Sequence, residues 1–330
     1  RPPSSTLFPY TTLFRSTELL NALWESLAGG KKEFADGVAL ATAAKRRAQI
    51  VLGVGLVLVG RQPKLEDQDL AKIIEAEAEK VIAAASCAKP AWLGPPEDDL
   101  LAIDYSRYRP RGFYTKNAIL ERHFRTVSWL QSIPFRVAKD EELLAALLLG
   151  HSARDLNLAV VQTFRRFLGT GDDWDLVAAA AEAGDSLSAT LSKEGLEVVR
   201  KRLMRRSGEP GQAPQISDQI RFPPADPNVT AEPGFRVLPA YRTPDAVLFH
   251  RTTDLRVFPN RGLPTGLEVC VALGSPFARE QLRDIEHGKV LAVIDRNRGL
   301  FTVGDSLYFQ YLGCLATLME IGRASCRERV

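Results

Sequence analysis

The sequence predicts a mainly α-helical protein, a multi-helical array or bundle with little β-structure. Apolar residues recur every three or four positions over most of the first 206 residues, as one buried face of a helix requires. An apolar run at residues 48–59 reads as a buried helix, because a span of the bilayer core needs about 20 such residues. Ten of the 20 prolines fall between residues 208 and 264, which predicts an extended segment with short turns there.

The periodicity places each helix along the chain. The first half is expected to contain helices at 17–30, 34–59, 70–81, 117–131, 139–149, 153–168, 173–183 and 193–206. The helical pattern returns after the proline-rich segment at 243–250, 265–273, 276–286 and 306–319. Residues 289–294, KVLAVI, fit a short strand or a helix about equally well.

Both ends of the chain have an unusual composition. Residues 6–16 back-translate, with one codon choice per residue, into a common sequencing adapter. Residues 320–330 back-translate into a sequence close to the reverse complement of that adapter. We therefore expect residues 1–16 and 320–330 to be non-native tails. The remaining residues, 17–319, are expected to be one helical domain from a longer parent, with two sub-regions, 17–206 and 207–319, packed together.

Removing these tails changes what composition implies. The chain has 43 basic and 40 acidic residues, and the tails hold five of the basic and two of the acidic ones, which leaves 38 of each. Net charge therefore gives no argument for nucleic acid or an anionic membrane as a partner. The remaining cysteines, 87, 270 and 314, are widely spaced and odd in number, so they predict neither disulfides nor a zinc site.

The stretch most suggestive of a ligand site is DYSRYRPRGFYTKN, residues 104–117, which directly precedes a predicted helix. Arg109 and Arg111 offer planar donor groups that suit a carboxylate or a phosphate. Tyr105 and Tyr114 offer flat aromatic faces with hydroxyl tips, as sugar and peptide sites do. These four residues are the candidate binding residues. The alternative is an architectural loop, in which Asp104 pairs with an arginine and the tyrosines pack against the helices.

Two residues are candidates for acid–base chemistry. His123 lies on the following helix, on a face with Leu120, Phe124 and Val127, and would lie beneath the arginine-containing loop if that loop folds over the helix. The alternative is a hydrogen-bonded core histidine. Asp104 is the second candidate, and no metal ligands and no cofactor are expected.

Other charged stretches favour structural roles. In residues 169–175, GTGDDWD, we expect Asp172 or Asp173 to cap a helix, since the spacing of a calcium loop is absent. Basic residues crowd the end of helix 193–206, which favours a solvated helix C-terminus over a nucleic-acid patch. Two arginine–carboxylate pairs, Arg242 with Asp245 and Arg261 with Glu268, fit buried ion pairs or substrate contacts. The common catalytic and phosphate-binding motifs are absent from the sequence.

Four segments in order resemble the bacterial domain-of-unknown-function 3160 family. The first, residues 104–115, is similar to the family's DYSQFKPRGHYT motif, and a helix follows it in both. The others are PAYRTPDAVLFHRTT, RGLPTGLEVCVALGSPFA and SLYFQYLGCLATLM, at 239–253, 261–278 and 306–319. Phe113 stands where the family tends to have His, Glu268 where it tends to have Asp, and Tyr311 where it tends to have Trp.

The resemblance implies a parent that is exported or lipid-anchored in bacteria, in the periplasm or cell envelope, and it supplies no reaction. Two functions remain open. One is a binding or structural module of the envelope, which the small number of titratable groups and Phe113 favour. The other is an exported hydrolase acting on a glycan or peptide in a cleft between helices. The expected partner is therefore a glycan or peptide, without nucleic acid and without a membrane span in residues 17–319.

Overall fold

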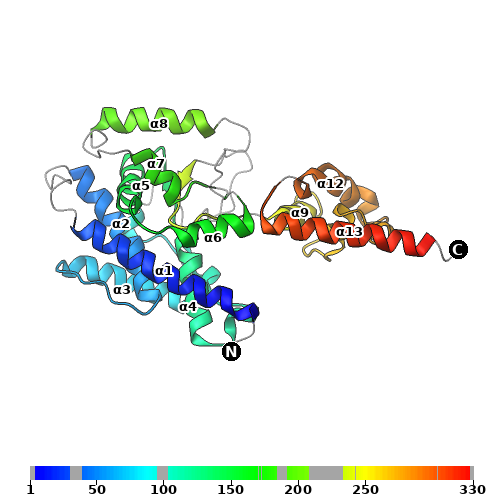
Figure 1. Ribbon diagram of the computed structural model, residues 1–330, viewed down its shortest axis with the longest axis horizontal. Coiled ribbons are helices and arrows are strands. Elements are labelled where there is room, and N and C mark those ends of the chain that lie inside the picture. Colours follow the sequence, from blue (N-terminus) through cyan, green and yellow to red (C-terminus); the bar gives the residue numbers. More distant parts are fainter. Residues whose placement is uncertain are drawn as a thin grey trace. The chain divides into compact units, whose positions relative to one another are not determined.

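The computed structural model describes residues 4–29, 39–94, 103–169, 171, 173–183, 192–207, 233–241, 243–302 and 304–327. This part contains thirteen α-helices, several short 3₁₀ helices and two antiparallel sheets of two strands each (Figure 1). The prediction of a mainly α-helical array is confirmed. Within the predicted extended segment, residues 208–232 lie outside the described residues.

The chain divides into two compact units. Unit 1 comprises residues 1–162 and 172–240, and unit 2 comprises residues 163–171 and 241–330. The predicted packing of residues 17–206 against 207–319 stays a prediction.

Unit 1 is built around α2 and α5, which contact each other and most of their neighbours. Its helices are α1 (Ser4–Gly29), α2 (Ala39–Leu58), α3 (Gln68–Ala83), α4 (Ala118–Ser132), α5 (Asp140–Ala153), α7 (Leu176–Ala183) and α8 (Lys193–Ser207). Helix α6 (Ala159–Leu168) begins in unit 1 and belongs to unit 2 from residue 163. In one sheet, β1 (Cys87–Ala88) pairs with β2 (Ile103–Asp104). In the other, β3 (Phe135–Arg136) pairs with β4 (Gly234–Phe235).

Glycines let the central helices approach closely. Gly53 of α2 faces α3, where an added Cβ would lie 2.4 Å from Ile74 Cδ1. Gly150 of α5 faces α7, where an added Cβ would lie 2.3 Å from the carbonyl carbon of Ala179. A glycine in a helix costs about 1 kcal/mol relative to alanine. At these two positions the close packing of α2 with α3 and of α5 with α7 explains why glycine stands there.

Three local predictions need correction. The helix expected at 153–168 begins later, at Ala159, because the Asn157 side chain caps this start by accepting from Ala159 N at 3.0 Å, and Ala153 is the last residue of the preceding helix. The helix expected from residue 173 begins at Leu176, and its cap is Asp175, which accepts from Val177 N at 3.0 Å. The first helix begins at Ser4, so it continues through residues 6–16, whose sequence lacks helical periodicity.

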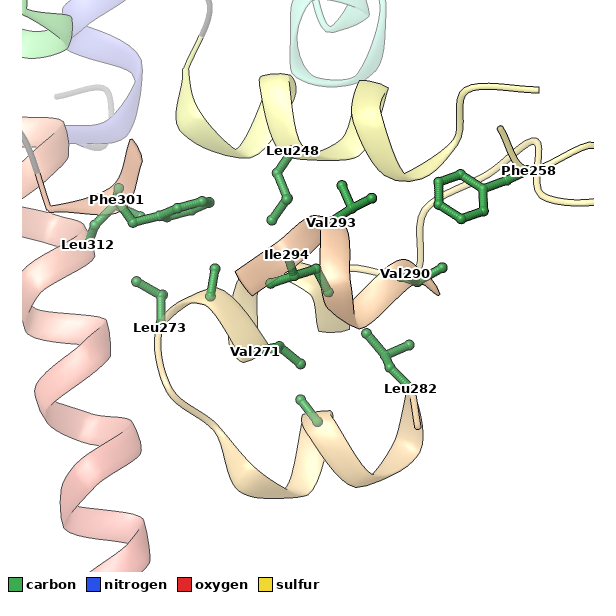
Figure 2. Packing of buried hydrophobic residues seen from close by; sticks show 12 residues of the cluster. Leu248, Phe258, Val271, Leu273, Leu282, Val290, Val293, Ile294, Phe301 and Leu312 are labelled. Atoms are coloured by element: carbon green, nitrogen blue, oxygen red, sulfur yellow. The ribbon is translucent and has the colours of Figure 1, made fainter. Parts of the chain in front are cut away.

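Unit 2 is a smaller set of helices with its own core. Its helices are α9 (Pro244–Thr252), α10 (Leu267–Ala272), α11 (Pro276–Gln281), α12 (Lys289–Asn297) and α13 (Leu307–Arg327). The stretch 289–294 is therefore helical. Figure 2 shows Ile294 of α12 among the apolar side chains of this unit, with Leu248 of α9 and Val271 of α10 in the same buried cluster.

Among the described residues, no helix is both long enough and apolar enough to cross a membrane.

Candidate functional site

The loop 104–117 is held at both of its ends by regular structure. Strand β2 pairs Asp104 with Cys87 of β1, and the 3₁₀ helix η2 (Tyr105–Tyr108) follows directly. A second 3₁₀ helix, η3 (Gly112–Thr115), leads into α4, whose first turn is capped by Asn117. The side chain of Asn117 accepts from Leu120 N at 3.0 Å, as an N-cap residue does.

Asp104 uses its carboxylate within the loop. Its Oδ1 accepts from the backbone N of Ser106 at 3.0 Å and from the Ser106 hydroxyl at 2.6 Å. Its Oδ2 lies 3.6 Å from Arg107 Nε. These contacts make Asp104 the cap of η2, and they fit the alternative of an architectural loop at this residue.

Tyr105 points into the interior. Its side chain is fully buried, and its hydroxyl donates to the carboxylate of Glu77, which is buried on α3. Lys80, one turn further along α3, places its Nζ 3.3 Å from the same carboxylate. Burial and then the charge of Glu77 raise the pKa of Tyr105 far above its ordinary value. Tyr105 therefore joins η2 to α3 and presents no hydroxyl to solvent.

Arg109 also contacts α3. Its Nη2 donates to the carbonyl oxygen of Ala84 at 3.2 Å, and Ala84 is the left-handed residue that ends the helix. Arg109 thus satisfies one of the carbonyl groups that a helix C-terminus leaves without an intrahelical partner.

Arg111 and Tyr114 face the surface. Arg111 is exposed, and among the described residues its guanidinium has no hydrogen-bond or ion-pair partner. The backbone N of Tyr114 donates to the carbonyl of Arg111 at 3.1 Å, so the two residues belong to one turn. The half-buried ring of Tyr114 packs on Phe124 of α4 at 5.2 Å between ring centroids. These two residues keep groups that a ligand can contact.

His123 lies beneath Tyr114. The two rings are stacked, with 5.9 Å between centroids and 12° between planes. His123 is 4% exposed, and neither of its ring nitrogens has a hydrogen-bond partner. Burial lowers the pKa of His123 from 6.5 to about 4, so the ring is neutral near pH 7. Its nitrogens make none of the hydrogen bonds that a satisfied core histidine would make.

The structure therefore brings together only part of the candidate set. Tyr114 and His123 are in contact, whereas Asp104, Tyr105 and Arg109 make their polar contacts within the loop and with α3. Whether any of these residues binds a ligand or reacts stays a prediction.

Two further buried polar residues belong to this region, and the helical spacing of the sequence could have identified both of them. Glu77 interrupts the apolar stripe of α3 one turn after Ile74, so a charged residue falls on a buried face. Thr126 follows His123 by three positions on α4, is fully buried, and its Oγ1 has no hydrogen-bond partner. In both cases the helical spacing alone places a polar group on a buried face.

The other charged stretches are structural. The predicted pair of Arg261 with Glu268 is present and buried in unit 2. Asp245 accepts from the hydroxyl of Tyr308 at 2.5 Å, and its expected partner, residue 242, lies outside the described residues. At the basic end of α8, Arg202 and Arg206 both pair with Glu182.

The comparison with protein families covers most of the chain. Residues 13–292 match the model of a family described as "Protein of unknown function (DUF3160)". The chain belongs to the DUF3160 family. The matched range contains the loop 104–117, the whole of α4 and four residues of the stretch 1–16 that the sequence assigns to an adapter. No curated protein and no solved structure matches this DUF3160 chain.

Proposed function

We propose that this chain is a helical binding module of the bacterial cell envelope, and that it contacts its ligand through Arg111 and Tyr114. The observation that carries the proposal is that the polar residues of loop 104–117 differ in whether their side chains are already paired. Asp104, Tyr105 and Arg109 are occupied by contacts that build the loop, while Arg111 remains exposed and unpaired. The envelope location rests on what the resemblance to the DUF3160 family implies about the parent protein.

The available groups indicate the chemistry of the ligand. A guanidinium binds an anionic oxygen pair with two parallel hydrogen bonds, and a neighbouring aromatic ring supplies apolar contact. The ring that lies next to Arg111 is that of Tyr114, which contacts Phe124 and His123. The ligand class that fits is a carboxylate-bearing glycan or peptide.

The test is a binding measurement with a matched control. Acidic oligosaccharides and acidic peptides are titrated against the wild-type chain, Arg111→Ala and Arg107→Ala by calorimetry. Arg107 is an exposed arginine in the same loop that already pairs with Asp104. We expect Arg111→Ala to weaken binding about tenfold or more, since a hydrogen bond to a charged group contributes about 1.5–3 kcal/mol. Equal losses in both variants would show that only net charge matters.

A hydrolase is the second candidate, and the unpartnered His123 is the observation that favours it. A neutral imidazole with a free nitrogen can accept a proton, as a general base must. Catalysis also requires Tyr114 to move away, because its ring covers His123. Turnover of glycan or peptide substrates that disappears in His123→Gln, with binding retained, would favour the hydrolase over the binding module.

A further inference from the structure

Two polar side chains on α4 are buried without hydrogen-bond partners. Both ring nitrogens of His123 and the hydroxyl of Thr126 are shielded from solvent and make no hydrogen bond. Buried polar groups in native proteins are nearly always hydrogen-bonded, and an unsatisfied one destabilises the fold. Such groups mark a place where a polar partner, a water molecule or a ligand group, is required.

The two residues form one donor–acceptor surface. They are three positions apart on a helix, so their side chains emerge as neighbours on the same face. A neutral imidazole has one donor and one acceptor nitrogen, and a threonine hydroxyl both donates and accepts. The group that complements them is itself a donor and an acceptor without charge. A hydroxyl group has this character, whereas a carboxylate only accepts.

His123 lies directly beneath the loop that carries the proposed binding residues, and Thr126 is three positions further along α4. The Tyr114 ring stacks on His123, and Tyr114 is joined to Arg111 by a hydrogen bond within one turn. The surface guanidinium of Arg111 is thus linked through Tyr114 to His123, which shares its helix face with Thr126. Because Tyr114 is half-buried on a short 3₁₀ helix, its ring has solvent on one side into which it can turn.

We propose that the ligand of this site is an acidic sugar. Arg111 binds the carboxylate, the Tyr114 ring turns from His123 onto the face of the sugar ring, and His123 with Thr126 binds a sugar hydroxyl. The inference rests on the proposed binding function and narrows its ligand from any carboxylate-bearing molecule to a uronate-type glycan.

The first test is thermal stability, which needs no ligand. Thr126→Val removes a hydroxyl that has no partner and keeps the shape of the side chain. Ser132→Ala on the same helix is the matched control, because the Ser132 hydroxyl bonds to Tyr108 Oη at 2.6 Å. We expect Thr126→Val to raise the melting temperature by about 2–4 °C and Ser132→Ala to lower it by a similar amount. A lower melting temperature for Thr126→Val would show that its hydroxyl is already satisfied, and would overturn the inference.

The second test is binding, with three probes: a hexagalacturonate, the neutral glycan maltohexaose and a hexaglutamate peptide. We expect binding of hexagalacturonate alone, weakened about tenfold in Thr126→Val, which remains folded and is more stable than wild type. Binding of hexaglutamate with the same affinity, or hexagalacturonate binding unchanged in Thr126→Val, overturns the inference and leaves the binding function intact. If no probe binds, both proposals fail, whatever the melting temperature of Thr126→Val.

Discussion

Arg236 and Asp173 form an ion pair that is entirely shielded from solvent, with 2.7 Å between Arg236 Nε and Asp173 Oδ2. Both partners also bind the backbone. Arg236 Nη1 donates to the carbonyl of Gln131 at 2.6 Å, and Asp173 Oδ1 accepts from Ala240 N at 2.9 Å. The pair therefore connects the end of α4, the segment before α7 and the chain that follows β4.

Removing the charge of Asp173 is expected to destabilise unit 1 strongly. Asp173→Asn keeps an oxygen for Ala240 but removes the negative charge that faces the buried Arg236 guanidinium. Loss of one partner of a buried ion pair costs about 3–5 kcal/mol. Urea unfolding followed by tryptophan fluorescence measures this loss, because Trp174 is next to the substituted residue.

The double variant Asp173→Asn with Arg236→Met is the control for that experiment. It removes both charges, so we expect it to be more stable than Asp173→Asn alone. If the double variant lost as much free energy of unfolding as the two single variants together, the two side chains would not be energetically coupled.

The two buried tyrosines of η2 are expected to differ in their contribution to stability. Tyr105→Phe leaves the buried carboxylate of Glu77 without its hydroxyl donor, which costs about 1.5–3 kcal/mol for a hydrogen bond to a charged group. Tyr108→Phe breaks a neutral bond, and Ser132 still donates to the carbonyl of Trp129, so a loss of about 0.5–1.5 kcal/mol is expected. Equal free energies of unfolding for the two variants would contradict this order.

Most of the helical architecture follows from the sequence because it depends on local spacing. Helix α8, Lys193–Ser207, was predicted at 193–206, and α4 begins after the asparagine expected at its start. The start of α6 was expected too early, at residue 153, because the signal for the later start was a single capping asparagine, Asn157. The stretch 289–294 stayed ambiguous for a physical reason: short apolar runs fit a strand and a helix alike.

The candidate site was less predictable, since its contacts join residues distant in sequence. The composition of loop 104–117 indicated carboxylate–arginine pairing and packed tyrosines, and Asp104 does lie near an arginine. It did not indicate that Glu77, on another helix, accepts from Tyr105. The partners of a buried polar group depend on which helices pack together, and periodicity does not encode that choice. The stacking of Tyr114 on His123 was anticipated only as a loop folding over a helix.

His123 is expected to make the stability of unit 1 depend on pH. Its pKa falls from 6.5 to about 4 on folding, because burial disfavours the charged ring. Above pH 6.5 the ring is neutral in both states and has no effect. As the pH falls from 6.5 to 4, only the unfolded state takes up the proton, and stability is lost at up to about 1.4 kcal/mol per pH unit.

Urea midpoints between pH 7 and 4, followed by tryptophan fluorescence, check this dependence. His123→Phe cannot take up a proton, so its midpoint should fall less than that of the wild-type chain over the same range. Parallel curves for the two proteins would show that His123 is not the group responsible.

Unit 2 offers a buried and an exposed ion pair for direct comparison. Arg261 and Glu268 are buried, and Glu268 also accepts from the hydroxyl of Thr265 at 3.1 Å. Arg279 and Asp295 form a bidentate pair that is partly exposed. We expect Glu268→Gln to cost about 3–5 kcal/mol, since Arg261 loses its counter-ion, and Asp295→Asn to cost about 0–1 kcal/mol.

The same carboxylate sets the response of unit 2 to acid. Burial tends to raise the pKa of Glu268, but hydrogen bonds from Arg261 and from the backbone outweigh it and lower the pKa below 4.5. The ionised Glu268 side chain stabilises the fold fully at a pH above its pKa in the unfolded state. This stabilisation is lost as the pH falls through the lower pKa that Glu268 has in the folded state. As the pH falls, the free energy of unfolding of unit 2 should therefore decrease less in Glu268→Gln than in the wild-type chain. Asp295→Asn should differ less from the wild-type chain.

The two units can be followed separately. All four tryptophans, at 24, 92, 129 and 174, belong to unit 1, so circular dichroism together with fluorescence separates the two units. An acid transition seen equally by both signals, and unchanged in Glu268→Gln, would assign the loss of stability to unit 1 instead.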